Sequence, residues 1–218
     1  MSPNRVLVFD MDGVLADVRE SYREGIIRTV RHFSGQTVTR ERIQDYKNAG
    51  GWNNDWALSQ QICHDFGVEA DYGEISRYFL DIFLGEDGLI QRETWIPRDG
   101  LLERLAARFR LAIFTGRLRI ELAPTLRRWV PQIRFDPIVT TEDVTHGKPH
   151  PEGLHTIARL CPGAELWYVG DTVDDARSAK AAGIPFIGIA SPANAGFLHA
   201  EGAVAVVEDI NTIEGVLP

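Results

Sequence analysis

The chain has 218 residues, which is enough for one large domain, or a domain with an insertion, around a sizeable core. Hydrophobic residues make up 44% and charged residues 25%, the proportions expected of a soluble globular protein. The net charge of -8 argues against a nucleic-acid or anionic-membrane partner, but it permits a small phosphorylated ligand, because local charge decides that contact.

Cysteine usage and the N-terminal sequence indicate where the chain works. Cys63 and Cys161 are too few for a disulfide framework and form no C-x-x-C pair, so we expect buried thiols in a reducing compartment. The first apolar run is too short for a signal peptide, and no run approaches the roughly 18 residues that cross a membrane. We therefore expect a cytoplasmic protein with no membrane partner.

The first predicted element is a buried strand over residues 6–9, which ends at Asp10, with Asp12 and Gly13 close behind. Alternation along an extended chain places Asp10 and Asp12 on the same side. Two carboxylates this close are costly unless a cation or a reacting group lies between them. Gly13 lets the backbone turn sharply and approach a ligand. The segment therefore indicates phosphate chemistry on a divalent metal.

About eighty residues separate this strand from the next one, far more than one crossover helix needs. Four amphipathic patterns punctuated by glycines predict four helices in this stretch. They cover residues 26–33, 39–46, 58–66 and 75–83. We interpret residues 17–96 as a small helical cap domain that is able to act as a lid.

The most unusual part of the cap is residues 47–56, between its second and third predicted helices. Trp52 offers a flat stacking face, and Asn53 can donate or accept hydrogen bonds. One interpretation is that Lys47, Trp52 or Asn53 contacts the substrate. The other is that Asn53 or Asn54 caps the next helix while the tryptophans pack in the cap core.

Five further apolar runs and three helical patterns follow the cap. The predicted strands cover residues 111–114, 137–139, 166–169, 185–189 and 203–207. The predicted helices cover residues 101–106, 120–129 and 174–182. Strands without polar alternation are covered on both faces. The alternation of such strands with helices along the chain therefore predicts an α/β fold with a doubly wound parallel sheet. We assign residues 1–16 and 97–218 to this core domain.

Polar residues end three of these strands. Asp10, Thr115 and Asp171 each lie at the carboxyl end of a predicted strand. Ligands of doubly wound sheets bind at that edge. We therefore expect the three side chains to converge on one crevice.

Four segments in order resemble the motifs of the haloacid dehalogenase-like (HAD) hydrolases, in the subgroup with a helical cap after the first motif. They are DMDGVL from Asp10, FTG from Phe114, KPHP from Lys148 and GDTVDD from Gly170. The resemblance covers the whole chain and extends to the phosphoglycolate phosphatase and beta-phosphoglucomutase-like branch. It implies a Rossmann-like core and an aspartyl-phosphate enzyme.

The resemblance implies a catalytic role for each motif residue. Asp10 would attack phosphorus as the nucleophile, and Asp12 would protonate the leaving oxygen and later deprotonate water. Thr115, Gly116 and Lys148 would hold the phosphoryl oxygens.

The resemblance also implies a Mg²⁺ site. Asp171 would ligate the ion together with Asp10 and the Asp12 carbonyl, a set of oxygens that suits a hard cation. Asp175 would hold a metal-bound water or orient Lys148. We assign Asp174, which lies between the two motif aspartates, to capping the helix that follows.

Three side chains next to the motifs are further candidates. Arg117, directly after the second motif, is a second candidate for substrate contact. His146 and His150 flank Lys148 and invite a metal interpretation, which we do not adopt because the expected oxygen chemistry needs no histidine.

The leading expectation is a Mg²⁺-dependent phosphatase for a small phosphomonoester, because dehalogenating members lack a carboxylate at the position of Asp12. A phosphomutase with the same intermediate is the alternative, since both classes share the four motifs. A receiver-like signalling module is remote, because its phosphorylated aspartate follows the third strand. The tryptophans favour a ring-bearing group such as an imidazole or nucleobase phosphate. Glycolate and sugar phosphates stay open, as does the oligomeric state.

Overall fold

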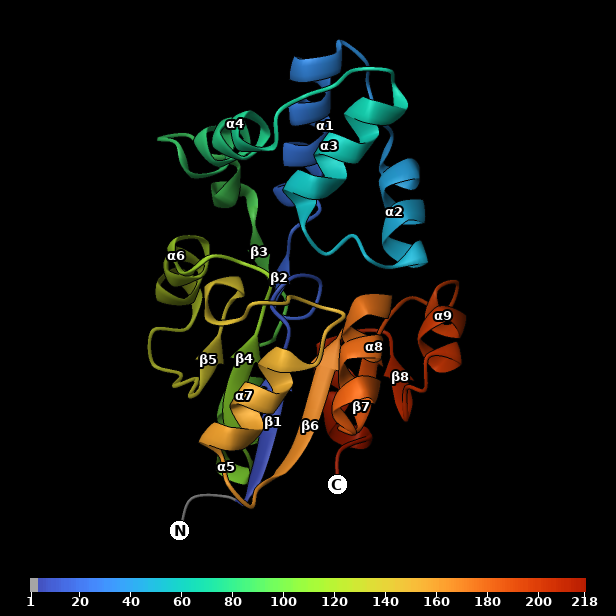
Figure 1. Cartoon of the computed structure of the whole chain (residues 1–218). Coiled ribbons are helices and arrows are strands. Elements are labelled where there is room, and N and C mark those ends of the chain that lie inside the picture. Colours follow the sequence, from blue (N-terminus) through green and yellow to red (C-terminus); the bar gives the residue numbers. More distant parts are fainter. Residues whose placement is uncertain (1–3) are drawn as a thin grey trace. The chain divides into compact units, whose positions relative to one another are not determined.

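The computed structural model describes residues 4–218, which form two compact units. One unit comprises the described residues up to Ala16 together with Trp95–Pro218, and the other is Asp17–Thr94 (Figure 1). The chain passes between them through a two-stranded sheet of β2 (Ala16–Asp17) and β3 (Thr94–Trp95).

The first unit is built on a six-stranded parallel sheet, which confirms the predicted α/β fold. Its strands are β1 (Arg5–Phe9), β4 (Arg110–Phe114), β5 (Ile138–Val139), β6 (Glu165–Gly170), β7 (Phe186–Ile189) and β8 (Ala205–Val207). Their order is β5-β4-β1-β6-β7-β8, so the strand order reverses on either side of β1. In such sheets the crevice at this switch point binds ligands.

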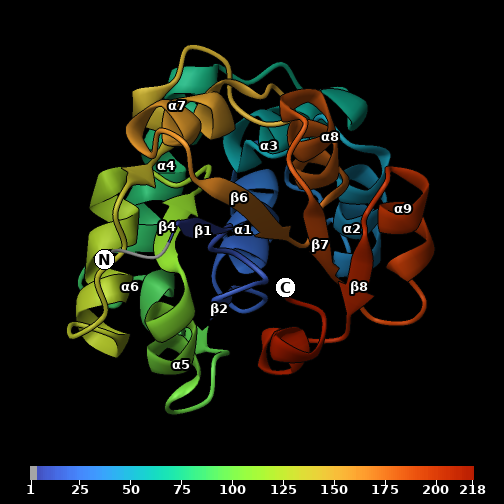
Figure 2. The same cartoon turned by 90° about the horizontal axis from the view of Figure 1, so that it is seen from below.

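Helices cover both faces of this sheet. They are α5 (Leu101–Arg108), α6 (Arg119–Trp129), α7 (Glu152–Leu160), α8 (Val173–Ala182) and α9 (Ala195–Ala200), with short 3₁₀ turns at Thr141–Asp143 and Ile210–Gly215. Figure 2 shows α7 and α8 on one face and α5 on the other. Alternate residues of β1, Val6 and Val8, share a buried cluster with Leu154 of α7 and Ala179 of α8. Continuous apolar strands are the expected result of this double cover.

The second unit is helical, as its sequence patterns predict. Its helices are α1 (Tyr22–Ser34), α2 (Arg40–Ala49), α3 (Asp55–Asp65) and α4 (Tyr72–Leu84), followed by a 3₁₀ turn at Leu89–Arg92. Side-chain caps begin three of them, because Thr39, Asn54 and Asp71 each accept hydrogen bonds from the first turn that follows. Ile26, Phe79 and other buried residues form a core within this unit. Within residues 4–218, the structure contains no helix with the length and apolarity that a membrane crossing requires.

A glycine lets α7 pack closely on the sheet. A Cβ on Gly153 would lie 2.1 Å from the Phe114 ring. We expect Gly153→Ala to lower the free energy of unfolding by about 1–3 kcal/mol, the usual cost of overpacking. The matched control is Gly196→Ala in α9, where no atom lies within 4 Å of the added Cβ. Urea unfolding should leave this control unchanged or slightly stabilised, and equal losses in both variants would contradict the packing argument.

Candidate active site

Lys148 lies buried between two carboxylates. Its Nζ is 2.7 Å from Asp10 Oδ1 and 2.8 Å from Asp175 Oδ1. The ammonium also lies 5.0 Å from the centroid of the Phe114 ring and 5.5 Å from that of Tyr168. Burial opposes the charge, but the two aspartates outweigh it and raise the pKa of Lys148. Lys148 is therefore a fixed positive charge beside Asp10.

The Asp175 carboxylate is fully engaged inside the protein. The Tyr168 hydroxyl donates to Oδ1 at 2.6 Å, while the amide and hydroxyl of Thr172 donate to Oδ2 at 3.0 and 2.6 Å. Burial raises the pKa of Asp175, but Lys148 and these hydrogen bonds lower it further than burial raises it. Asp175 was expected either to hold a metal-bound water or to orient Lys148, and these contacts support the second role.

The N-cap of α8 is Thr172, whose hydroxyl accepts from the Asp175 amide at 3.1 Å. The predicted capping role of Asp174 is therefore wrong. Asp174 is the second residue of the helix, where its backbone already has helical geometry, so its side chain does not occupy the capping position.

Asp10, Asp171 and Asp175 form a cluster in which one carboxylate oxygen from each residue lies within 4.8 Å of the others. Burial raises the pKa of Asp10 to about 7, helped by Asp175 and Asp12 and opposed by Lys148. Burial and the charges of Asp175 and Asp10 also raise the pKa of Asp171 well above its usual range. The single positive charge of Lys148 does not balance the negative charges of these three carboxylates when they are ionised. The donor set and its excess negative charge fit a divalent hard cation such as Mg²⁺.

The turn after β1 explains the glycine in the first motif. Gly13 has φ +72°, and its amide donates to the Ala16 carbonyl at 2.9 Å. A Cβ there would lie 2.0 Å from Asp171 Oδ2. A side chain at this position would displace Asp171, so the close approach of the first and fourth motifs requires glycine.

Thr115 and Gly116 follow β4, the neighbour of β1. Thr115 is buried, its amide donates to the Val139 carbonyl at 3.0 Å, and its hydroxyl accepts from the Arg117 amide at 3.2 Å. Gly116 is exposed. The register pairs Phe9 with Ile113 and with Val169, so Asp10, Thr115 and Asp171 follow adjacent strand ends as expected.

Arg117 contacts Asp12. Its side chain is buried, and Nε and Nη2 lie 2.7 and 2.6 Å from Asp12 Oδ1. Nη1 donates to Thr125 Oγ1 at 3.0 Å. These contacts make Arg117 a support for the Asp12 carboxylate, a function that the sequence analysis did not identify. They give no support to its predicted contact with substrate.

Lys47 and Trp52, two of the candidate specificity residues, have partners within the helical unit. Lys47 Nζ lies 2.6 Å from Asp55 Oδ1 and donates to the Trp52 carbonyl at 2.8 Å. The Trp52 ring meets the Tyr46 ring edge-on at 5.7 Å. Asn54 caps α3, as the capping alternative predicts, and Trp52 packs against the core of this unit. Asn53 is partly buried, and a substrate role for these residues stays a prediction.

The family relationship of the chain agrees with this geometry. The model for the haloacid dehalogenase-like hydrolases matches residues 5–183. The chain belongs to this family. The enzyme is 25% identical, with a TM-score of 0.67, to a subfamily IA HAD hydrolase from Geobacter sulfurreducens, covering 98% of this chain and 96% of that one.

Curated relatives include enzymes whose names contain a phosphorylated compound or pyrophosphate. A pyrophosphatase PpaX from Bacillus velezensis is 27% identical, with 87% of this chain and 86% of that one aligned. An imidazoleglycerol-phosphate dehydratase from Phytophthora nicotianae is 36% identical over 203 residues. That alignment covers 88% of this chain but 44% of the relative, so the enzyme spans less than half of that protein.

The raised pKa of Asp10 predicts an unusual dependence of stability on pH. The pKa rises from 3.8 to about 7 on folding. The metal-free folded chain therefore holds a proton that the unfolded chain has lost, and its stability falls as pH increases through this interval. In chelator, we expect the free energy of unfolding to fall between about pH 5 and pH 7, by up to about 1.4 kcal/mol per pH unit for one such group.

Urea unfolding of wild type and Asp10→Asn at both pH values checks this expectation. The variant should show a shallower slope, and Mg²⁺ should restore wild-type stability at the higher pH. Identical slopes in both proteins would show that Asp10 is not the group responsible.

Proposed function

We propose that the enzyme is a Mg²⁺-dependent phosphatase that hydrolyses a small phosphomonoester through an aspartyl-phosphate on Asp10. The observation that carries this proposal is the pairing of the buried Lys148 with Asp10, which belongs to the acidic cluster and lies two residues before Asp12. Asp10, the Asp12 carbonyl and Asp171 would hold the metal ion, which would supply positive charge to the phosphoryl oxygens when bound.

In the first step an Asp10 oxygen bonds to phosphorus as the ester P–O bond breaks, and Asp12 gives a proton to the leaving oxygen. In the second step Asp12 takes a proton from water, the water oxygen attacks phosphorus, and the bond to Asp10 breaks to release inorganic phosphate. Asp10 and Asp12 return to their starting states.

Supporting residues hold these two aspartates in place. Lys148 offsets charge on the phosphoryl oxygens, and Asp175 fixes its position. Thr115 and the amide of Gly116 are further donors to those oxygens. Arg117 orients Asp12, so each reacting carboxylate has its own buried cation.

A phosphomutase with the same intermediate is the second candidate. The enzyme is 25% identical, with a TM-score of 0.70, to a candidate beta-phosphoglucomutase from Thermotoga maritima across 98% of this chain. A mutase passes the phosphoryl group to a second hydroxyl of the substrate and leaves no net free phosphate.

A ring-bearing phosphomonoester is our preferred substrate class. The Phytophthora relative is named for an enzyme of imidazoleglycerol phosphate, and a stacking role for Trp52 toward such a ring stays a prediction from the sequence. Imidazole and nucleobase phosphates therefore come first in a substrate panel, before glycolate phosphate, sugar phosphates and pyrophosphate.

Phosphate release from this panel with Mg²⁺ tests the proposal. We expect release from a few related compounds and a loss of at least about 10⁴-fold in Asp10→Asn, which removes the nucleophile. Turnover that survives in Asp10→Asn would refute its assignment. Phosphate migration with a bisphosphate activator, without net release, would establish the mutase.

Arg117→Met should lower kcat by about 10- to 100-fold with little change in KM, because it disturbs the position of the general acid. An aryl phosphate needs less protonation of its leaving group than an alkyl phosphate does. We therefore expect a smaller loss for p-nitrophenyl phosphate than for an alkyl ester, with partial rescue in Arg117→Lys. Equal losses for both substrates would assign Arg117 a merely structural role.

A further inference from the structure

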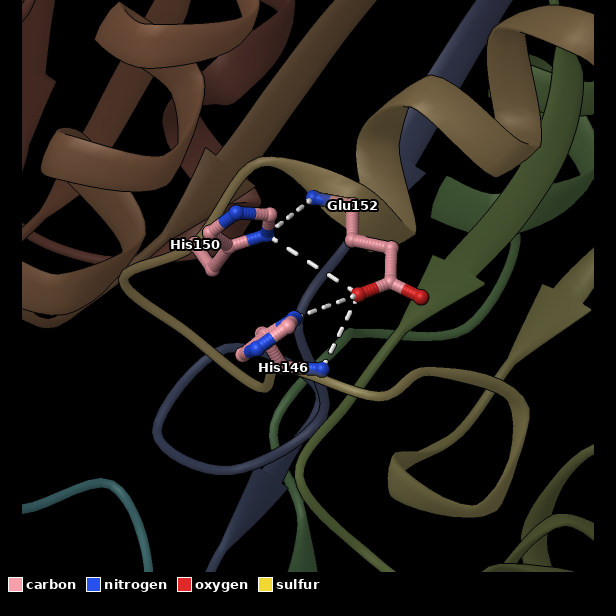
Figure 3. A group of neighbouring side chains, drawn as sticks. All are labelled: His146, His150 and Glu152. Carbon is pink, nitrogen blue, oxygen red and sulfur yellow. Dashed lines mark hydrogen bonds and ion pairs between the residues drawn. The ribbon is translucent and has the colours of Figure 1, made fainter.

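We propose that His146, His150 and Glu152 form a second metal site, which takes a Zn²⁺-like transition metal and lies outside the acidic cluster. His146 Nδ1 is 3.3 Å from Glu152 Oε2, and His150 Nδ1 is 3.9 Å from the same oxygen. Figure 3 shows that Nδ1 of each histidine is directed at this carboxylate. The inference stands independently of the proposed phosphatase activity.

The spacing of the donor atoms suits a tetrahedral ion. Bonds of about 2.0–2.1 Å at a tetrahedral angle separate two ligand atoms by about 3.3 Å. The His146–Glu152 distance already has this value, and His150 needs to approach by about 0.6 Å. One donor atom from each of the three residues lies within 4.8 Å of the others. Both histidines are exposed, which leaves the fourth position open to water.

Backbone contacts hold these ligands in place without a metal. Glu152, the first residue of α7, accepts from the amides of Thr145 and His146, each at 2.9 Å. The His150 amide donates to the Gly147 carbonyl at 3.0 Å, and its own carbonyl accepts from Ser178 Oγ at 3.1 Å. Metal binding therefore requires small side-chain movements rather than a change of fold.

The donor chemistry separates this site from the acidic cluster. Two imidazoles and one carboxylate match the ligands of zinc, whereas Mg²⁺ keeps to oxygen ligands. On binding, His146 would carry its proton on Nε2 so that Nδ1 offers a lone pair. The weak contact from the Glu152 amide to His150 Nδ1, at 3.3 Å, would be exchanged for a metal bond. Excess Mg²⁺ should therefore fill the acidic cluster and leave this site available.

Calorimetric titration of the untagged full chain with Zn²⁺ in excess Mg²⁺ tests the proposal. We expect one Zn²⁺ per chain, and Co²⁺ as a spectroscopic probe should show the intense visible bands of a tetrahedral ion with nitrogen ligands. His146→Ala and His150→Ala should each weaken binding by at least about 10-fold. His155→Ala removes an exposed histidine of α7 outside the cluster and should bind as wild type does.

Asp171→Asn, which disables the acidic cluster, should keep the Zn²⁺ titration intact. Phosphatase activity with Mg²⁺ should be unchanged in the His146 and His150 variants, so a failure of this site and a failure of the proposed function are distinguishable. Unaltered Zn²⁺ affinity in the His146→Ala/His150→Ala double variant would overturn the proposal. Loss of Zn²⁺ binding in Asp171→Asn or on addition of Mg²⁺ would overturn it as well.

Discussion

The buried ammonium of Lys148 is the interaction on which the rest of the site depends. A charge removed from water costs several kcal/mol unless close partners and further hydrogen bonds offset the loss. Asp10 and Asp175 provide the partners at 2.7 and 2.8 Å, and Tyr168 and Thr172 satisfy the remaining capacity of Asp175. Because these residues come from β6, α8 and the end of β1, the ion pair ties the core of the sheet to its reactive edge.

This arrangement leaves an imbalance of charge that is useful for binding. Lys148 lowers the pKa of Asp175 successfully, but Asp10 and Asp171 keep raised pKa values because burial and the neighbouring carboxylates outweigh the lysine. A site that is unfavourable when empty and ionised gains most when a cation enters. The same physical feature would therefore link binding of the proposed metal ion to the stability of the fold.

The sequence predicted the sheet and the meeting of its motifs because both follow from local patterns. Apolar runs locate the strands, and residues at strand ends converge in a parallel sheet. The contact between Arg117 and Asp12 could not be predicted from local patterns. It joins side chains 105 residues apart, and their directions depend on packing. Thr172 and not Asp174 caps α8, and this difference of two positions is finer than a sequence pattern resolves.

The segment around Lys148 shows how one short loop can carry two kinds of chemistry. Lys148 is buried and pairs with carboxylates, while His146 and His150 on either side of it are exposed. Glu152 closes the loop by accepting from the amides of Thr145 and His146, and Nδ1 of each histidine faces one oxygen of the same carboxylate. The acidic cluster beside Lys148 offers oxygen ligands, whereas the proposed site on the loop itself offers mainly nitrogen, so the two sites would select different cations.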